Sequence, residues 1–164
     1  FKIPYTSSVG ARRLPTHAED DWSVKVREVA HEYGTTTGRP RDILYPDLPL
    51  LTYNARMSGI EMLVGTHLDV AWEDMPIKVC THYTDKKGRV VSYQPGLDYL
   101  KDVVPHYVLL PGWDGRVVRS AQTFKQLPEN ARKFLAFIQR RTGVPIVAVT
   151  TGAARNNYLE IPAY

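Results

Sequence analysis

The sequence of 164 residues contains a single cysteine, Cys80, so no disulfide can form within the chain. It has no apolar run near the roughly 18 residues that a membrane helix requires, no visible signal peptide, and neither repeats nor low-complexity segments. These absences exclude a disulfide-stabilised scaffold and a transmembrane helix, and we expect a protein of the reducing cytoplasm. Because the chain begins with Phe1 rather than methionine, we also expect it to be processed or truncated.

The composition fits one soluble domain. Hydrophobic residues make up 43% and charged residues 23% of the chain, which are ordinary values for a globular protein with a real core. The formal net charge of +4 is modest. It suits a site for a small anion as well as it suits a nucleic-acid surface, so charge alone does not choose between them.

Hydrophobic spacing, together with the positions of glycine and proline, predicts alternating helices and strands. Helices are expected over residues 18–33, 47–58 and 128–143, and a short helix or turn over 97–104. Strands are expected in the first part of 60–70, over 77–84 and 89–93, within 106–113 and over 144–150. The two strands around the short turn 85–88 predict a β-hairpin. Thr16 or Asp20 is expected to cap the first helix, Gly34 to end it, and Gly143 to end the last helix. This alternation is typical of an α/β or α+β protein.

The segment His31–Asp42, HEYGTTTGRPRD, concentrates hydrogen-bond donors directly after the first predicted helix. Gly34 and Gly38 let the backbone approach a ligand closely, and three threonines between them supply hydroxyls and amides. Arg39 and Arg41 supply planar guanidinium groups that suit carboxylates and phosphates. Composition does not decide between an anion-binding loop and a solvated turn. The segment is not a phosphate loop, because the glycine–lysine–serine/threonine pattern is absent.

Two further segments follow predicted strands, at the position where α/β sheets bind their ligands. In THLDV (Thr66–Val70), the carboxylate of Asp69 suits the N1–H and amino group of a guanine, although spacing alone favours an aspartate that caps a turn. VTTGAARNN (Val149–Asn157) offers hydroxyls, a glycine and exposed backbone for the rim of a nucleotide site, although spacing alone favours a plain loop.

No group of side chains points to a metal site or a nucleophile. The five histidines are scattered without metal-ligand spacing, and Cys80 is expected in the core because it lies within a predicted strand.

Taken together, these motifs resemble adenylosuccinate synthetase, a family of enzymes that join a purine nucleotide to aspartate. The resemblance covers nearly the whole chain and follows its order. It rests on YTSSVG (5–10), EYGTTTGRPR (32–41), THLDV (66–70), IKVCTHY (77–83), LPGW (110–113), LPENARKF (127–134), TGVPI (142–146) and TTG (150–152). The segment EYGTTTGRPR is similar to the family's aspartate-binding loop and is fairly specific on its own.

The resemblance implies roles for individual residues. The aspartate-binding loop would comprise Thr35, Thr36, Thr37, Gly38, Arg39, Pro40 and Arg41. Val9 and Arg39 would contact IMP. The GTP-binding residues would be Arg41, His67, Leu68, Asp69, Thr150, Thr151 and Gly152. The implied partners are IMP, L-aspartate and GTP, with neither nucleic acid nor membrane, and the implied cofactors of the complete enzyme are GTP and Mg²⁺.

The sequence also departs from the family. His67 stands where the family usually has lysine, ARRLPT (11–16) replaces a glycine–proline stretch, and GAARNN (152–157) lacks the usual proline and aspartate. The family's phosphate loop, catalytic aspartate, catalytic histidine and magnesium ligands do not occur in the sequence. Phosphoryl transfer depends on such groups, so we predict that the chain alone is inactive, and we assign it no catalytic residue and no metal ligand.

The implied fold is α/β, the end of a mostly parallel sheet flanked by helices, with a smaller α+β part that contains the β-hairpin. Within this C-terminal part of a synthetase, residues 1–70 would form the aspartate- and IMP-site end of the central sheet region, and 71–164 the smaller α+β region. The complete enzyme would be a homodimer. Two alternatives stay open: a stand-alone, non-catalytic module that binds nucleotides and carboxylates, and a divergent synthetase acting on another purine nucleotide.

Overall fold

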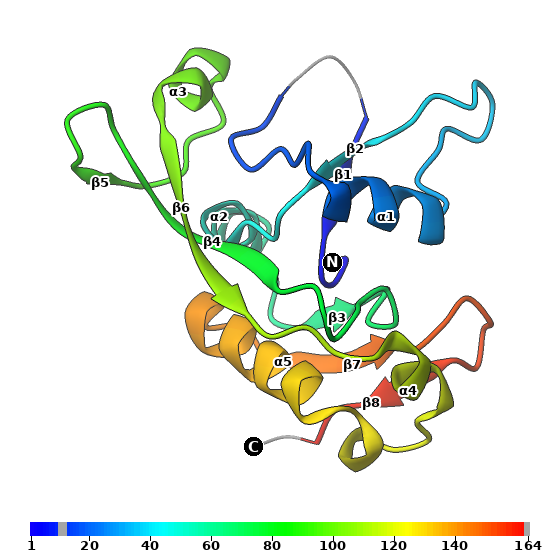
Figure 1. Cartoon of the computed structure of the whole chain (residues 1–164). Helices are drawn as coiled ribbons and strands as arrows, with labels where there is room; N and C mark the ends of the chain where they lie inside the picture. Colours follow the sequence, from blue (N-terminus) through cyan, green and yellow to red (C-terminus); the bar gives the residue numbers. More distant parts are fainter. Residues whose placement is uncertain (10–12, 163–164) are drawn as a thin grey trace.

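The computed structural model describes residues 1–9 and 13–162 (Figure 1). Its helices are α1 (Asp21–Val29), α2 (Leu48–Met57), α3 (Leu97–Asp102), α4 (Gly115–Ser120) and α5 (Glu129–Thr142), with a 3₁₀ turn at Phe124–Gln126. Its strands are β1 (Thr6–Ser8), β2 (Asp42–Leu44), β3 (Leu63–Gly65), β4 (Ile77–Thr84), β5 (Val90–Val91), β6 (Val104–Leu110), β7 (Ile146–Thr150) and β8 (Tyr158–Glu160). Helices and strands alternate, which confirms the mixed α/β class.

The strands of the described residues form three small sheets rather than one large one. Strands β1 and β2 pair antiparallel, as do the strands of the sheet β5–β4–β6, while in the sheet β3–β7–β8 only the pair β3–β7 runs parallel. A mostly parallel sheet is therefore not found in the part of the chain that the structure describes. The physical reason is the length of the connections, since parallel neighbours need a long crossover and the short links β4–β5 and β7–β8 permit only antiparallel pairing.

The predicted β-hairpin is confirmed, because β4 and β5 pair antiparallel with Thr84 opposite Val90. The longer partner of β4 is β6, which runs beside it from Ile77 opposite Leu110 to Thr84 opposite Val104. Figure 1 shows this pair as a long ribbon that crosses the molecule beside α2.

Helix α1 is shorter than predicted at both ends. Asp20 caps its start, as one of the two expected caps, and accepts a 3.2 Å hydrogen bond from a first-turn amide. Thr16 is buried instead, and its hydroxyl lies 3.2 Å from a carboxylate oxygen at the start of α2. The prediction that Gly34 ends the helix is wrong, because the helix ends at Val29 and His31 already has a left-handed φ of 52°.

Helix α5 follows the prediction closely. Gly143 ends the helix with a φ of 73°, and the predicted apolar face, Phe134, Leu135 and Ile138, is buried. Pro128 immediately precedes the first helical residue. The helix therefore has the amphipathic character that lets it cover the sheet beside it.

The largest core lies between α5 and the sheet β3–β7–β8 (Figure 1). Trp113, Phe134 and Ile146 belong to it, together with Ile3 and Leu68 from the first part of the chain. A second core beneath α1 and β2 and a third beneath the hairpin complete the interior. Cys80 lies in the third core as a fully buried free thiol, as predicted. None of the helices in the described part of the chain is long and apolar enough to span a bilayer.

Candidate functional site

The donor-rich segment forms a turn that connects α1 to β2 (Figure 1). Its two sides meet at a β-bridge between Tyr33 and Pro40, and Gly34 N–H donates to the carbonyl of Arg39 at 2.8 Å. Gly38 N–H closes the turn with a 2.8 Å bond to the carbonyl of Gly34, and its φ of 65° favours glycine. All of the residues between the two sides of this turn are exposed: Thr35, Thr36, Thr37, Gly38 and Arg39.

An open cavity of about 510 Å³ and another of about 380 Å³ lie at the predicted site segments. The smaller one adjoins the donor-rich turn, and its lining consists of Ser8, Val9, Gly34, Thr37, Arg39, Pro40, Arg41 and Asp42. The strand pair β1–β2 makes this possible, because it places Ser8 opposite Asp42. The structure thus brings five of the predicted site residues together around one cavity, whereas Thr35, Thr36 and Gly38 do not line it; the five are Val9, Thr37, Arg39, Pro40 and Arg41.

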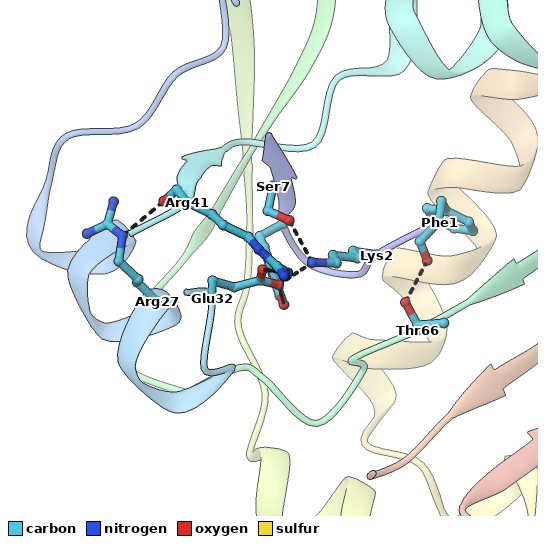
Figure 2. Close-up of polar contacts among 8 residues, drawn as sticks. Phe1, Lys2, Ser7, Arg27, Glu32, Arg41 and Thr66 are labelled. Atoms are coloured by element: carbon cyan, nitrogen blue, oxygen red, sulfur yellow. Dashed lines mark hydrogen bonds and ion pairs between the residues drawn. The ribbon is translucent and has the colours of Figure 1, made fainter. Parts of the chain in front are cut away.

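A buried carboxylate lies beneath this turn (Figure 2). The side chain of Glu32 is 2% exposed and forms ion pairs with Lys2 and with Arg41, whose Nη1 lies 2.9 Å from Oε2. Its Oε1 accepts a 2.5 Å hydrogen bond from the Tyr5 hydroxyl as well as the bond from Lys2. Lys2 also donates to Ser7 Oγ at 2.6 Å, so the network extends into β1.

The network keeps Glu32 ionised. Burial by itself raises the pKa of this carboxyl, but the hydrogen bonds from Lys2, Tyr5 and Arg41 outweigh burial and lower the pKa to about 2. Burial and the neighbouring carboxylate raise the pKa of Tyr5, so its hydroxyl remains a donor. Glu32 is therefore a carboxylate at neutral pH, held by two cations and a phenol.

Sequence reasoning did not assign a role to Glu32, although it lies at the start of the quoted motif. Its partners Lys2 and Tyr5 are 30 and 27 residues away, and this spacing does not predict that they contact Glu32. The available signal was an acidic residue beside a turn rich in cations, since a buried carboxylate needs such partners.

The other two predicted segments lie side by side at the ends of β3 and β7. The parallel pairing places Gly65 opposite Val149, so both strands end at the same edge, as expected for segments that share a ligand. His67 N–H donates to Thr150 Oγ1 at 3.1 Å and joins the two segments directly. His67 adopts a φ of 63°, and its ring meets the Tyr5 ring edge-on at 5.6 Å. Burial, with the charge of Lys2, lowers the pKa of His67, so its imidazole is neutral at pH 7.

Leu68 and Asp69 point to different surroundings. Leu68 is fully buried and its carbonyl accepts a 2.8 Å bond from the Trp113 indole, so its side chain belongs to the core. Asp69 is partly exposed, and its Oδ2 lies 3.2 Å from Nη1 of Arg119. The carboxylate lines the cavity of about 510 Å³ together with Trp72, Arg119 and other residues of α4 and the preceding loops. Thr150, Thr151 and Gly152 do not line this cavity, and Thr150 is instead joined to His67 by a hydrogen bond.

The segment after β7 is a tight turn. The buried Thr151 donates its N–H to the carbonyl of Asn157 at 2.9 Å, and Asn157 N–H donates to Ala154 at 2.9 Å. A Cβ at Gly152 would lie 2.5 Å from the amide nitrogen of the Asn157 side chain, so the turn has little room for a larger residue. Local packing thus explains why a glycine occupies this position of the TTG motif, independently of any ligand.

The side chains present do not offer a magnesium site. Among residues 1–9 and 13–162, no three or more histidine, cysteine, aspartate or glutamate side chains cluster in a way that suits a metal ion. Glu73, Asp74 and Asp114 line the larger cavity without forming such a group.

Comparison with known proteins accounts for this arrangement. The family model described as adenylosuccinate synthetase matches residues 3–159. The curated adenylosuccinate synthetase of Solibacter usitatus is 39% identical over 93% of the chain, and that of Lactobacillus acidophilus is 41% identical over 92%. The chain spans about 35% of the length of each of these relatives. A solved structure of fully ligated adenylosuccinate synthetase from Plasmodium falciparum superimposes with a TM-score of 0.91 at 31% identity, over 98% of this chain and 38% of that one. The chain belongs to the adenylosuccinate synthetase family.

Proposed function

We propose that the chain is the C-terminal part of a GTP-dependent ligase that joins L-aspartate to IMP and forms adenylosuccinate in AMP biosynthesis. The observation that carries the proposal is the smaller cavity, where Val9 from the end of β1 faces Thr37, Arg39 and Arg41 from the turn. A ribose contact and a carboxylate-binding turn on one cavity suit a reaction between a nucleotide and an amino acid. The match to the family over residues 3–159 supports the same reading.

The turn supplies the binding groups for aspartate. The hydroxyls of Thr35, Thr36 and Thr37 are exposed and can donate to the carboxylates of the substrate. The Gly38 amide is already bonded to the Gly34 carbonyl and closes the turn. Arg39 would bind a substrate carboxylate and reach the IMP ribose that Val9 also contacts, since both residues line the same cavity. Pro40 and the bridge between Tyr33 and Pro40 hold the end of the turn in place.

The second pair of segments would bind the guanine of GTP. Asp69 would accept the N1–H and amino group of the base, and His67 would pack against the ring. Because the Leu68 side chain is in the core, Leu68 would contribute only backbone groups. Thr150, Thr151 and Gly152 would close the other side of the base, next to His67. Arg41 would hold the aspartate-binding turn in register with this half of the site through Glu32.

The chain would bind and orient substrates without activating them. In the proposed reaction, the γ-phosphoryl group leaves GTP for O6 of the purine, and the aspartate amine then attacks C6 and displaces phosphate. The described residues lack a cluster that could hold Mg²⁺, and the sequence lacks a phosphate loop, so we assign no step to a metal within this chain. The turn's contribution is to fix the amine against the purine, which converts an encounter in solution into a positioned attack.

The same proposal covers fold and assembly. In the complete protein, β3 and β7 would be the end of a mostly parallel sheet, with residues 71–164 as the smaller α+β region and residues 1–70 at the aspartate and IMP end. We place the complete enzyme in the cytoplasm as a homodimer that uses GTP with Mg²⁺.

A second candidate function rests on His67. Its neutral ring is already engaged with Tyr5 and its backbone is left-handed, so it cannot present the fixed charge and long stem of a lysine to a base. This observation favours a synthetase that acts on a different pair of nucleotides. The two candidates are separated by the turnover of the complete enzyme with GTP against ATP, and with IMP against GMP.

The test of the main proposal has two arms. The complete protein, supplied with GTP, Mg²⁺, IMP and aspartate, is expected to form adenylosuccinate, followed by absorbance, and omission of any one substrate should abolish the signal. The isolated chain is expected to show no turnover under the same conditions. Turnover by the isolated chain, or none by the complete protein with any purine pair, would overturn the proposal.

A further inference from the structure

The exposed tip of the aspartate-binding turn, Thr35 to Arg39, is held in place only by the residues at the two ends of the turn. Within the described residues, none of the side chains from Thr35 to Arg39 forms a hydrogen bond or ion pair with a residue outside the turn. The backbone bonds of Gly34 and Gly38 lie within the turn itself. The position of Arg39 opposite Val9 therefore depends on what fixes the two residues that enter and leave the turn, Glu32 and Arg41.

Glu32 connects this base to the rest of the molecule. Its carbonyl accepts the N–H of Arg41 at 2.9 Å, and its carboxylate pairs with the Arg41 guanidinium at 2.9 Å, so one residue holds Arg41 by both backbone and side chain (Figure 2). The carbonyl of Arg41 in turn accepts a 3.0 Å bond from Arg27 Nε of α1. On its other side, Glu32 Oε1 accepts bonds from Lys2 and Tyr5, which both precede β1 in the sequence. Strand β1, which Val9 follows directly, and the turn that carries Arg39 are thus fixed to a single carboxylate.

The network requires the negative charge of the Glu32 carboxylate. Three donors point at it, from Lys2, Tyr5 and Arg41, and two of them are cations. A glutamine of the same shape would offer one carbonyl oxygen to three donors and would direct an amide N–H₂ group at another donor. The Arg41 guanidinium, whose Nε is buried without a partner among the described residues, would then lose its ion pair as well.

We propose that Glu32 is a positioning residue for aspartate in the ligase reaction. Through Arg41 and Lys2 it holds the turn in register with strand β1, which Val9 follows. This inference rests on the proposed function. Glu32 itself does not line the cavity. Its removal should therefore weaken the use of aspartate more than the use of GTP. Arg41, which pairs with Glu32, is one of seven residues assigned to GTP, whereas every residue assigned to aspartate lies in the turn.

The main test is Glu32→Gln in the complete protein, with Glu61→Gln as a matched control. Glu61 is an exposed carboxylate outside the turn and outside the network, and its loss removes the same charge. A hydrogen bond to a charged group is worth about 1.5–3 kcal/mol, so we expect Glu32→Gln to raise the KM for aspartate by about 10-fold or more. The KM for GTP should change less than about threefold, and the control variant should match wild type.

Amide hydrogen exchange gives a readout that does not depend on the reaction. In the isolated chain, Glu32→Gln should speed exchange of residues 34–41 by about tenfold or more, whereas the amides of β7 should be unchanged. Should Glu32→Gln fail to fold, Glu32→Asp replaces it, since a shortened but charged side chain should raise the KM for aspartate by about threefold or more.

The outcomes distinguish a failure of the positioning role of Glu32 from a failure of the proposed function. A rise confined to aspartate, with faster exchange in the turn, supports the positioning role. An unchanged KM for aspartate in a folded variant, or an equal rise for all three substrates, overturns it. Faster exchange in the turn together with no adenylosuccinate from wild-type protein would instead contradict the proposed function and leave the network's structural effect standing.

Discussion

The two regions proposed to bind ligands are held by different physical means. His67 and the TTG turn follow parallel strands that pack on α5, and the carbonyl of Leu68 is fixed by the buried indole of Trp113. The turn proposed to bind aspartate projects from the surface with an exposed tip, and one buried carboxylate holds its base. A region built on the core should lose function together with stability, whereas a projecting turn can lose function while the fold stays intact.

The largest effect on stability is expected from a substitution in the core that supports His67 and the TTG turn. Trp113→Ala removes a side chain that is 1% exposed, lies edge-on to Phe134 at 5.2 Å and donates to the carbonyl of Leu68. We expect a loss of about 3–5 kcal/mol in the free energy of unfolding, because a cavity and an unsatisfied buried carbonyl appear together. Urea denaturation of the chain measures it, with the exposed Val90→Ala as control. A loss below about 1 kcal/mol would contradict the core role of Trp113.

The next effect concerns the base of the turn and depends on pH. The pKa of Glu32 is about 2 in the folded chain, against 4.5 when unperturbed, so the unfolded chain binds the proton first as pH falls. The ionised carboxylate therefore contributes stability that is fully present above about pH 4.5 and disappears towards pH 2. We expect wild type to lose about 3 kcal/mol over this window relative to Glu32→Gln. Urea denaturation measures the free energy of unfolding of both proteins as a function of pH. If it changes with pH in the same way in both, the ion pairs of Glu32 do not form.

A smaller effect is expected at the tip of the turn. Gly38 has a φ of 65° and open space around its Cα, so Gly38→Ala costs backbone strain and meets no steric clash. We expect about 1–2 kcal/mol of destabilisation. Gly96→Ala is the matched control, because Gly96 has a φ of −72° and its substitution meets only an ordinary contact. Equal stability of the two variants would argue against a left-handed residue at position 38.

The smallest effect on stability should come from Arg39→Ala. The side chain is exposed and forms no ion pair with a described residue, so the free energy of unfolding should stay within about 0.5 kcal/mol of wild type. Thermal denaturation measures the stability of this variant and of Arg41→Ala. Arg41→Ala should be the less stable of the two, because Arg41 pairs with Glu32. A large loss of stability for Arg39→Ala would mean that the tip is part of the packed fold.

The sequence predicted most of what depends on neighbouring residues. Helix α5 with its glycine stop, the hairpin β4–β5 and the strands β3 and β7 follow from local spacing, as does the turn with its glycines. The end of α1 was missed because a left-handed His31 is not a usual helix stop. The pairing of β1 with β2 and the role of Glu32 were missed because both depend on contacts about 30 residues or more apart, which local patterns do not encode. The mostly parallel sheet came from the resemblance, and the described residues contain only one parallel pair of strands.

The central claim is that the projecting turn serves aspartate and the core-built region serves the guanine nucleotide. The most direct measurement is a crossed comparison of Arg39→Ala and Asp69→Asn in the complete protein, with KM values determined for aspartate and for GTP. We predict that Arg39→Ala raises the KM for aspartate by about 10- to 100-fold and leaves that for GTP within about threefold, while Asp69→Asn does the reverse. If both variants raise both values equally, or if Arg39→Ala acts on GTP alone, the assignment of the two regions is wrong.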